Sequence, residues 1–326
     1  MGMTVFERGW LSSNNVLFDG PGGTALVDSG YLTHAPQTLA LVRHALGERK
    51  LDRLLNTHLH SDHCGGNAIL QAHFACHTAI PAAEAVKVRD WDEDALSFRA
   101  TGQQCDRFSV DAVLRPGDTV DLGGAPWQVL AAPGHDNHAL LLFCPADGTL
   151  IAGDALWENG FGVIFPELEG EPGFDEQAAT LELIAQLAPK QVIPGHGAPF
   201  TDVAGALVRA RSRLAYLSAD PKRNAENAVK VMLKFLLLER QNIALADIAA
   251  LFDAIPVIHG PCARQLATST AELAPWAAAA LVRAGAARST DGSLFNVNES
   301  QKSSTVVLFS HYNRLAGPIN LPESSS

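Results

Sequence analysis

The stretch that decides the fold of this chain is Thr57-His58-Leu59-His60-Ser61-Asp62-His63-Cys64-Gly65-Gly66-Asn67. It places three imidazoles and one carboxylate within the six residues 58–63. Burying such polar side chains together is costly because each loses its hydration, and a bound cation offsets that cost. The spacing therefore predicts a metal site in this segment.

The sequence on either side of this stretch predicts where the site lies in the fold. Residues 52–58 are typical of a buried strand that ends at His58, and residues 68–74 are typical of a helix. The loop between a strand's carboxyl end and the next helix is where α/β proteins place their sites. Gly65 and Gly66 are expected to let the backbone turn sharply and approach the metals.

Three later segments repeat this arrangement, with a histidine or aspartate beside glycine at the end of a predicted strand. They are Pro133-Gly134-His135, Ile151-Ala152-Gly153-Asp154 and Val192-Ile193-Pro194-Gly195-His196-Gly197. The repetition indicates that these strand ends converge. Upstream, Ala25-Leu26-Val27-Asp28-Ser29-Gly30 also ends a predicted strand.

Taken in chain order, these five segments within residues 24–197 resemble the five motifs of the metallo-β-lactamase superfamily, a group of mostly metal-dependent hydrolases. The resemblance implies an αβ/βα four-layer sandwich, whereas the alternation of strands and helices alone favours only the α/β class. Several antibiotic-degrading members have a cysteine where this chain has Asp154. The aspartate is therefore more similar to the glyoxalase II-like and lactonase-like branches.

The resemblance also implies seven metal ligands and one supporting residue. The ligands are His58, His60 and His135 for a first ion, Asp62, His63 and His196 for a second, and Asp154 as the bridge between both. Asp62 and Asp154 are also the candidate catalytic residues. Asp28 is expected to hydrogen-bond the ligand loop and hold its shape, the alternative being a simple turn residue before Gly30.

This ligand set predicts the chemistry. A metal lowers the pKa of bound water from about 16 to about 7, and two ions can share the resulting hydroxide. We therefore expect two divalent ions, zinc first, with iron or manganese also compatible with nitrogen and oxygen ligands. The predicted function is a binuclear metal-dependent hydrolase that uses a metal-bridging hydroxide on a small ester, thioester or lactone. No Gly-x-Ser-x-Gly segment competes with this prediction.

Two other functions stay open at this point. A mononuclear iron oxygenase similar to the persulfide dioxygenases would use only His58, His135 and Asp154 as a facial triad. A non-enzymatic metal-binding sensor would keep the ligands without turnover.

The region after Asp154 predicts the substrate-facing wall. The apolar, glycine-rich segment 159–166 is unlike a regular helix, and Trp157, Asn159 and Phe161 are the candidate substrate-binding residues. The alternative is an ordinary surface loop. A glutathione-dependent role would need basic residues, and Lys222 and Arg223 lie at a possible place.

Composition restricts the partners. The net charge of −11 disfavours nucleic acid as a substrate, and a small-molecule substrate is expected instead. The five cysteines form no CxxC pair, which predicts reduced thiols and a cytoplasmic location. Cys64 is interpreted as a small buried hydrophobe rather than a metal-perturbing thiolate. The N-terminus lacks a signal-like apolar run, and the apolar run 231–238 is too short for a bilayer, so no membrane association is expected.

The chain is expected to divide into residues 1–218, a catalytic domain, residues 219–297, a helical and winged-helix-like domain, and residues 298–326, a tail. The second part predicts helices at 225–240, 245–252 and 275–284, followed by a hairpin with an Asp291-Gly292 turn. Residues 220–300 contain 8 basic and 8 acidic residues, which disfavours DNA binding. This part is expected to shape the pocket or to mediate association, for example in a homodimer. The tail segment 305–309 could add a strand or contact a partner.

Overall fold

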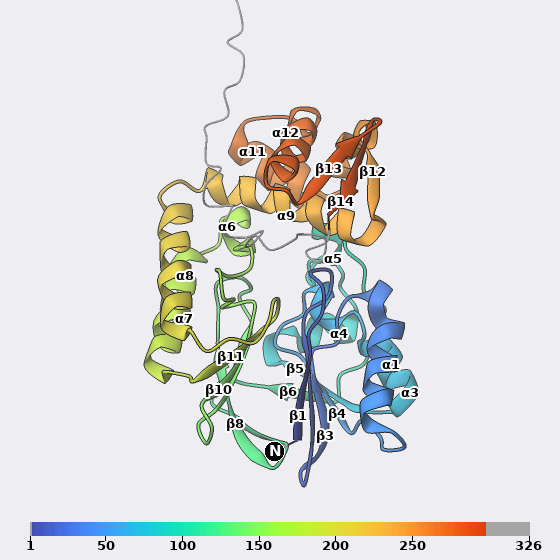
Figure 1. Ribbon diagram of the computed structural model, residues 1–326, viewed down its shortest axis with the longest axis vertical. Coiled ribbons are helices and arrows are strands. Elements are labelled where there is room, and N and C mark those ends of the chain that lie inside the picture. The colour runs from blue at the N-terminus through green and yellow to red at the C-terminus, as the bar shows by residue number, and fades with distance from the viewer. Residues whose placement is uncertain (1, 298–326) are drawn as a thin grey trace, which may run out of the picture.

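The computed structural model describes residues 2–297, and two β-sheets lie face to face at its centre (Figure 1). The first sheet has the strand order β1-β2-β3-β4-β5-β6. Its strands are Gly2–Phe6, Asn15–Gly20, Gly23–Val27, Arg53–Leu55, His77–Pro81 and Ala112–Leu114. The second sheet has the order β11-β10-β9-β8-β7. Its strands, from β7 to β11, are Thr119–Leu122, Ala125–Ala131, Leu140–Cys144, Thr149–Gly153 and Gln191–Pro194.

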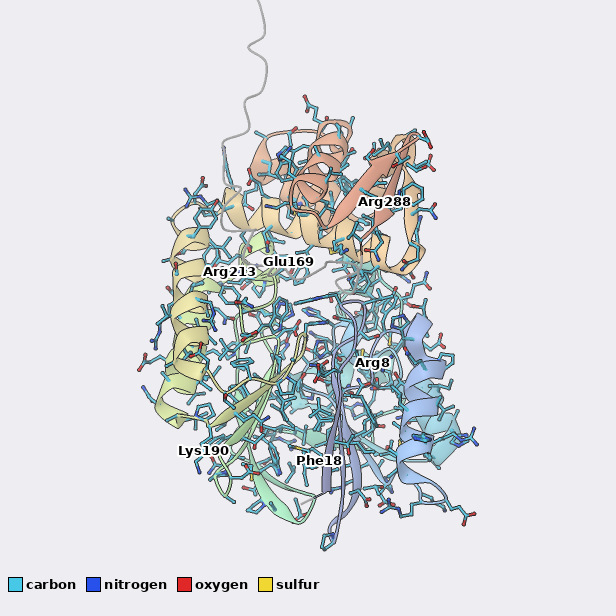
Figure 2. The ribbon with its side chains drawn as sticks, viewed as in Figure 1. Arg8, Phe18, Glu169, Lys190, Arg213 and Arg288 are labelled. Carbon is cyan, nitrogen blue, oxygen red and sulfur yellow. The ribbon has the colours of Figure 1, made fainter. Side chains whose placement is uncertain are left out.

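Strand alternation explains how the central strands bury side chains on both faces of a sheet. Successive side chains of a strand point to opposite faces. In β2, Val16 and Phe18 join the cluster between the two sheets, while Leu17 joins a second cluster with helix residues such as Val42. Figure 2 shows Phe18 in the region between the sheets. Positions 16–18 of β2, which are buried on alternating faces, are therefore all apolar.

Helices cover the outer face of each sheet. The helices α1 (Ala35–Leu46) and α3 (Asn67–Phe74) lie against the first sheet, and α7 (Phe174–Leu187) and α8 (Val203–Ser218) lie against the second (Figure 1). This arrangement confirms the predicted α/β sandwich. Short helical segments complete this part of the chain: η1 (Leu32–His34), α2 (Ser61–Cys64), η2 (Ala82–Glu84), α4 (Ala85–Asp90), α5 (Phe98–Thr101) and α6 (Phe165–Glu169).

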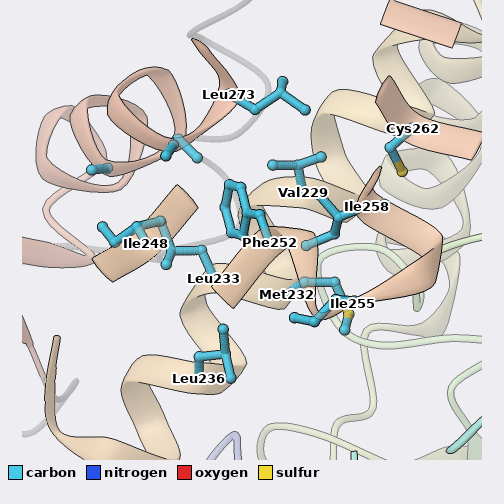
Figure 3. Packing of buried hydrophobic residues seen from close by; sticks show 14 of the residues in the cluster. Val229, Met232, Leu233, Leu236, Ile248, Phe252, Ile255, Ile258, Cys262 and Leu273 are labelled. Atoms are coloured by element: carbon cyan, nitrogen blue, oxygen red, sulfur yellow. The ribbon is translucent and has the colours of Figure 1, made fainter. Parts of the chain in front are cut away.

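A helical region lies across one end of the sandwich (Figure 1). Its longest helix is α9 (Lys222–Arg240). The other elements are β12 (Asn242–Ala244), η3 (Leu245–Asp247), α10 (Ile248–Asp253), η4 (Ile258–Cys262), α11 (Ala263–Leu266), α12 (Thr270–Arg283), β13 (Ala287–Thr290) and β14 (Ser293–Asn296). Figure 3 shows the apolar cluster that Leu233, Phe252 and Ile258 build in this region.

The C-terminal elements differ in detail from the prediction. The final helix begins at Thr270 rather than residue 275, because Ser269 and Glu272 form a capping box that starts the helix earlier. The predicted hairpin is present as β13 and β14, and β12 adds a third strand beside β14. The domain limits and the winged-helix interpretation stay predictions, and the predicted tail segment 305–309 lies outside the described residues.

Among residues 2–297, no single helix is long and apolar enough to cross a membrane. One bent pair of segments is long and apolar enough when the two are taken together. These segments are Leu245–Asp253 and Ile258–Leu266, and they meet at 96°.

Candidate metal centre

The strand directions bring the predicted ligands to one edge of the sandwich. β8 and β10 are both antiparallel to β9, so they run parallel to each other, and β11 is parallel to β10. Their carboxyl ends therefore share one edge, and His135, Asp154 and His196 follow these three ends. The remaining four ligands follow β4 of the facing sheet. β4 itself ends at Leu55, three residues earlier than predicted, because the amide of Thr57 leaves the ladder to donate to Asp28.

Three histidines form the first cluster. The ligand atoms of His58, His60 and His135 lie within 4.8 Å of one another. His60 Nδ1 and His135 Nε2 are 2.8 Å apart. His135 Nδ1 donates to the carbonyl of Val163, which leaves Nε2 without a proton and directed into the site.

Asp154 lies between this cluster and a second one formed with Asp62, His63 and His196. Its Oδ1 is 3.4 Å from His63 Nε2, and its Oδ2 is 3.8 Å from His196 Nε2. The same Oδ2 is 3.5 Å from His135 Nε2 of the first cluster. One carboxylate thus faces both groups, which is the position that a bridging ligand requires.

The protonation states of His58, His135 and Asp154 suit a cation. Burial and the neighbouring imidazoles lower the pKa of His58 well below its usual range, and burial lowers the pKa of His135 to about 4. Burial by itself would raise the pKa of Asp154, but His196 and His63 outweigh it and hold the pKa well below its usual range. Neutral His58 and His135 beside an ionised Asp154 are the forms that bind metals. The carboxylates of Asp154, Asp28 and Asp62 outweigh burial and raise the pKa of His63 well above its usual range, so a cation bound there would displace a proton from this ring.

Buried ring nitrogens without a hydrogen-bond partner also indicate that the site fits a metal ion. His58 Nε2 and His63 Nε2 have no hydrogen-bond partner among the described residues, although both rings are buried. Buried polar atoms are rarely left without a partner. A metal ion in contact with these nitrogens would satisfy them, so the donor set fits divalent ions.

Asp28 connects the first sheet to the ligand loop. Its Oδ1 accepts from the amide of Thr57 at 2.9 Å, and its Oδ2 accepts from Thr57 Oγ1 and His63 Nδ1, each at 2.8 Å. The backbone of Asp28 has φ +59°, a left-handed conformation that costs a non-glycine residue about 1 kcal/mol or more. The hydrogen bond to Nδ1 leaves Nε2 of His63 as the free ligand atom.

Gly65 and Gly66 have a different role from the one predicted. Gly65 has φ −63° and Gly66 has φ −89°, values that any residue adopts. A Cβ at Gly65 would lie 2.4 Å from the amide nitrogen of Leu32, and one at Gly66 would lie 2.5 Å from the carbonyl oxygen of Ser29. The glycines therefore permit close packing against residues 29–32 and not a sharp turn.

A buried polar network, which no sequence pattern predicted, supports the ligand loop. Asn67 donates to Asn56 Oδ1 at 2.7 Å and accepts from Ser29 Oγ at 2.7 Å. Asn56 in turn donates to the carbonyl of His63 at 3.0 Å. The only signal in the sequence is the presence of amide side chains next to apolar strands.

Two tryptophans line the site. The ring of Trp10 stacks on His196, with centroids 5.2 Å apart and planes at 8°. Trp157 Nε1 donates to Asp154 Oδ1 at 3.1 Å. Both rings line a pocket that also contains Asp62 and Phe165. Trp157 thus lies at the pocket, where the sequence placed it, while Trp10 carried no recognisable signal.

Two other candidates for the substrate wall lie elsewhere. Phe161 is fully buried in the core of the second sheet, with the guanidinium of Arg213 5.3 Å from its ring centroid, so it is not part of the wall. Figure 2 shows Arg213 on the α8 side of the molecule. Asn159 is half-buried and does not line the pocket. From the predicted segment, Gly162, Val163 and Phe165 line the pocket instead.

Cys64 points away from the ligands. It is fully buried, with Sγ 3.5 Å from the carbonyl oxygen of Leu59 and 3.7 Å from Cys105 Sγ. Burial raises the pKa of this thiol well above its usual range. These contacts agree with the interpretation as a small buried hydrophobe.

We expect Cys64→Ala to keep its metal content and to stay within about threefold of the unchanged protein in hydrolysis, because only a small buried group is lost. Elemental analysis and a rate measurement check this, with Cys76→Ala, another buried thiol, as the control. Loss of metal in Cys64→Ala alone would show that the sulfur takes part in the site.

The comparisons with known proteins identify the family. A family model described as the metallo-beta-lactamase superfamily matches residues 8–196, more than half of the 326 residues. The chain belongs to the metallo-beta-lactamase superfamily. It is 30% identical to a hydroxyacylglutathione hydrolase of Acidiphilium cryptum over 193 residues, which are 59% of this chain and 67% of that protein. A hydroxyacylglutathione hydrolase of Hyphomonas neptunium is 30% identical over 148 residues, 42% of this chain and 50% of that protein.

Solved structures extend the likeness of the fold beyond the family match. A metallo-beta-lactamase family protein from Thermus thermophilus has a similar fold, with a TM-score of 0.55 and 20% identity. The match covers 91% of the chain described here and 98% of the Thermus protein. The protein TTHA1623, solved in a di-iron-bound form, matches 64% of this chain and 98% of its own, with a TM-score of 0.51 and 25% identity.

Superfamily membership confirms the predicted metal-dependent hydrolase and its divalent-metal site at the coarse level. The alignments with the curated relatives span half to two-thirds of those proteins. Their substrates are therefore statements about those proteins only.

Proposed function

We propose that this protein is a binuclear metal-dependent hydrolase of a small ester, thioester or lactone. The observation that carries the proposal is the place of Asp154, whose carboxylate oxygens face His135 of one cluster and His63 and His196 of the other. A single-metal site would need no carboxylate between two ligand groups. When bound, two such ions supply an activated water and polarise the substrate carbonyl.

The protein's own residues divide the work around this centre. His58, His60 and His135 would hold one ion and Asp62, His63 and His196 the other. Asp62 Oδ2 faces His196 Nε2 at 3.0 Å, so its other carboxylate oxygen is the group that would accept a proton from the attacking water. Asp28 fixes the ring of His63 throughout. The tryptophans at positions 10 and 157 exclude bulk water from one side of the site.

The first test is the metal content of the full chain purified without added metal, followed by assay on neutral thioesters, esters and lactones. We expect close to two divalent ions per chain and hydrolysis of at least one substrate class. One iron per chain, with oxygen uptake on a persulfide and no hydrolysis, would overturn the proposal in favour of the oxygenase. Two ions without turnover on any substrate would favour the sensor.

Removal of the metal gives a second expected result. A chelator should abolish hydrolysis, and zinc or iron should restore it. A ligand that binds only the folded state stabilises it by about 4 kcal/mol at ~1,000 times its Kd. The chelated protein should therefore unfold at a lower temperature, as measured by thermal denaturation with and without added metal. An unchanged melting temperature would contradict a buried metal site.

A further inference from the structure

We infer that the substrate carries a compact apolar acyl group, which binds between the metal centre and one face of α9. This inference rests on the proposed function and adds the substrate class. It derives from α9, which lies wholly outside residues 8–196, the part that matches the family model.

One face of α9 closes the pocket over the ligands. The residues that line the pocket recur at helical spacing, so they form a single stripe along the helix. They are Val231, Met232, Lys234, Phe235 and Leu238. Phe165 faces them from α6, with its ring centroid 5.2 Å from that of His60. The wall opposite the metal-binding atoms is therefore almost entirely hydrocarbon.

The one basic side chain of this wall, Lys234, points away from the pocket toward the C-terminal hairpin. Lys234 is the only lysine or arginine among the described residues that line the pocket. Its Nζ donates to the carbonyls of Ala286 and Val297, at 2.9 Å and 3.2 Å, and to the side chain of Asn296. Its charge thus holds the C-terminal hairpin against α9. A substrate with several carboxylates would find no opposite charge on this wall.

The predicted basic pair does not serve the pocket either. Lys222 is exposed at the first turn of α9, and Arg223 packs on Tyr216, 4.1 Å from the ring centroid. Neither residue lines the pocket. Val231 is nine positions after Lys222, which is about 13 Å along a helix at 1.5 Å per residue. A glutathione thioester, with its two carboxylates, therefore suits this wall poorly.

The cavity also limits the size of the acyl group. Its volume is about 100 Å³. An apolar cavity of roughly 150 Å³ accommodates the six carbons of benzene, so by proportion this one suits about four carbons beyond the carbonyl carbon, which would lie at the metal centre. We expect a butanoyl chain to fit, a hexanoyl chain to fill the space and a decanoyl chain to exceed it.

The test is a series of acetyl, butanoyl, hexanoyl and decanoyl thioesters and esters with neutral leaving groups, on the metal-loaded full chain. Burial of a methylene contributes ~0.8 kcal/mol, or about fourfold in kcat/KM. We expect hexanoyl to exceed acetyl by about 10²-fold and decanoyl to gain nothing further. S-lactoylglutathione should be at least about tenfold poorer than hexanoyl. A flat series, or preference for the glutathione thioester, would overturn the inference.

Variants and a binding measurement separate this inference from the proposed function. Val231 and Leu238 are half-buried, so Val231→Ser and Leu238→Ser should fold and should each reduce the ratio of hexanoyl to acetyl kcat/KM about tenfold. Val208→Ser, on an exposed position of α8, is the matched control.

Binding of the product acids is followed by the fluorescence of Trp10 and Trp157, which line the pocket. Hexanoate should bind more tightly than acetate, and Val231→Ser should weaken it. If no substrate is hydrolysed, the proposed function fails, yet this difference in binding would still support the apolar site. Equal binding of both acids would overturn it.

Discussion

Asp154→Asn is expected to lower kcat/KM by more than about 10³-fold, a loss of ~4 kcal/mol of transition-state stabilisation. The amide keeps the size of the side chain but removes the negative charge that faces His63, His135 and His196. In the proposed binuclear centre both ions would lose a ligand at once, so elemental analysis should find less than one metal per chain.

Asp147→Asn is the matched control, because the same change is made at an exposed position just before the other end of β10. It should leave metal content and rate unchanged. If Asp154→Asn kept two metals and most of its activity, Asp154 would not be the bridge.

Gly195→Ala is expected to be nearly as damaging, although it adds only one methyl group. A Cβ at this position would lie 2.1 Å from Asp154 Oδ1 and 2.9 Å from His63 Cε1. The backbone has no room to retreat, because the amide of Gly195 donates to Gly153 O at 2.7 Å and its carbonyl accepts from Asn14 N at 2.7 Å. A displacement of a catalytic group by about 1 Å can cost ~10²-fold in rate.

We therefore expect a loss of at least about 10²-fold in kcat/KM and weaker metal binding, with the fold retained by circular dichroism. Gly9→Ala is the control, since a Cβ there would meet nothing within 4 Å. A Gly195→Ala protein with full activity would show that the carboxylate and the imidazole can move apart without loss, and the close packing described here would be wrong.

Local patterns in the sequence predicted several strands of the sandwich, and the resemblance to the superfamily predicted the sandwich itself. β3, β10 and β11 are buried on both faces, and continuous apolar runs of this kind are readable without knowledge of partners. Elements whose stability depends on distant contacts were missed or shifted. The three-residue strand β12 exists because it pairs with β14, some fifty residues later in the chain.

The polar residues around the site were also hard to predict from sequence, because their roles depend on contacts with residues far along the chain. Asp28 has three hydrogen bonds to Thr57 and His63, residues about thirty positions away, and only these contacts distinguish it from a turn residue. Trp10 stacks on His196 across most of the catalytic part of the chain. No local pattern marks either relation.

By itself, the sequence determined the superfamily and brought together the residue types that bind metal. Four of these side chains fall within residues 58–63, so they stay close in any compact fold, and the other three follow strands whose ends had to meet. The tertiary structure alone decided what faces the metals. Phe161, predicted to face the substrate, lies in the core, whereas Val231 and Leu238 line the pocket over the site. The physical reason is that the pocket wall depends on how a helix from the far end of the chain packs, and amphipathic spacing specifies that a helix has an apolar face but not which surface covers it.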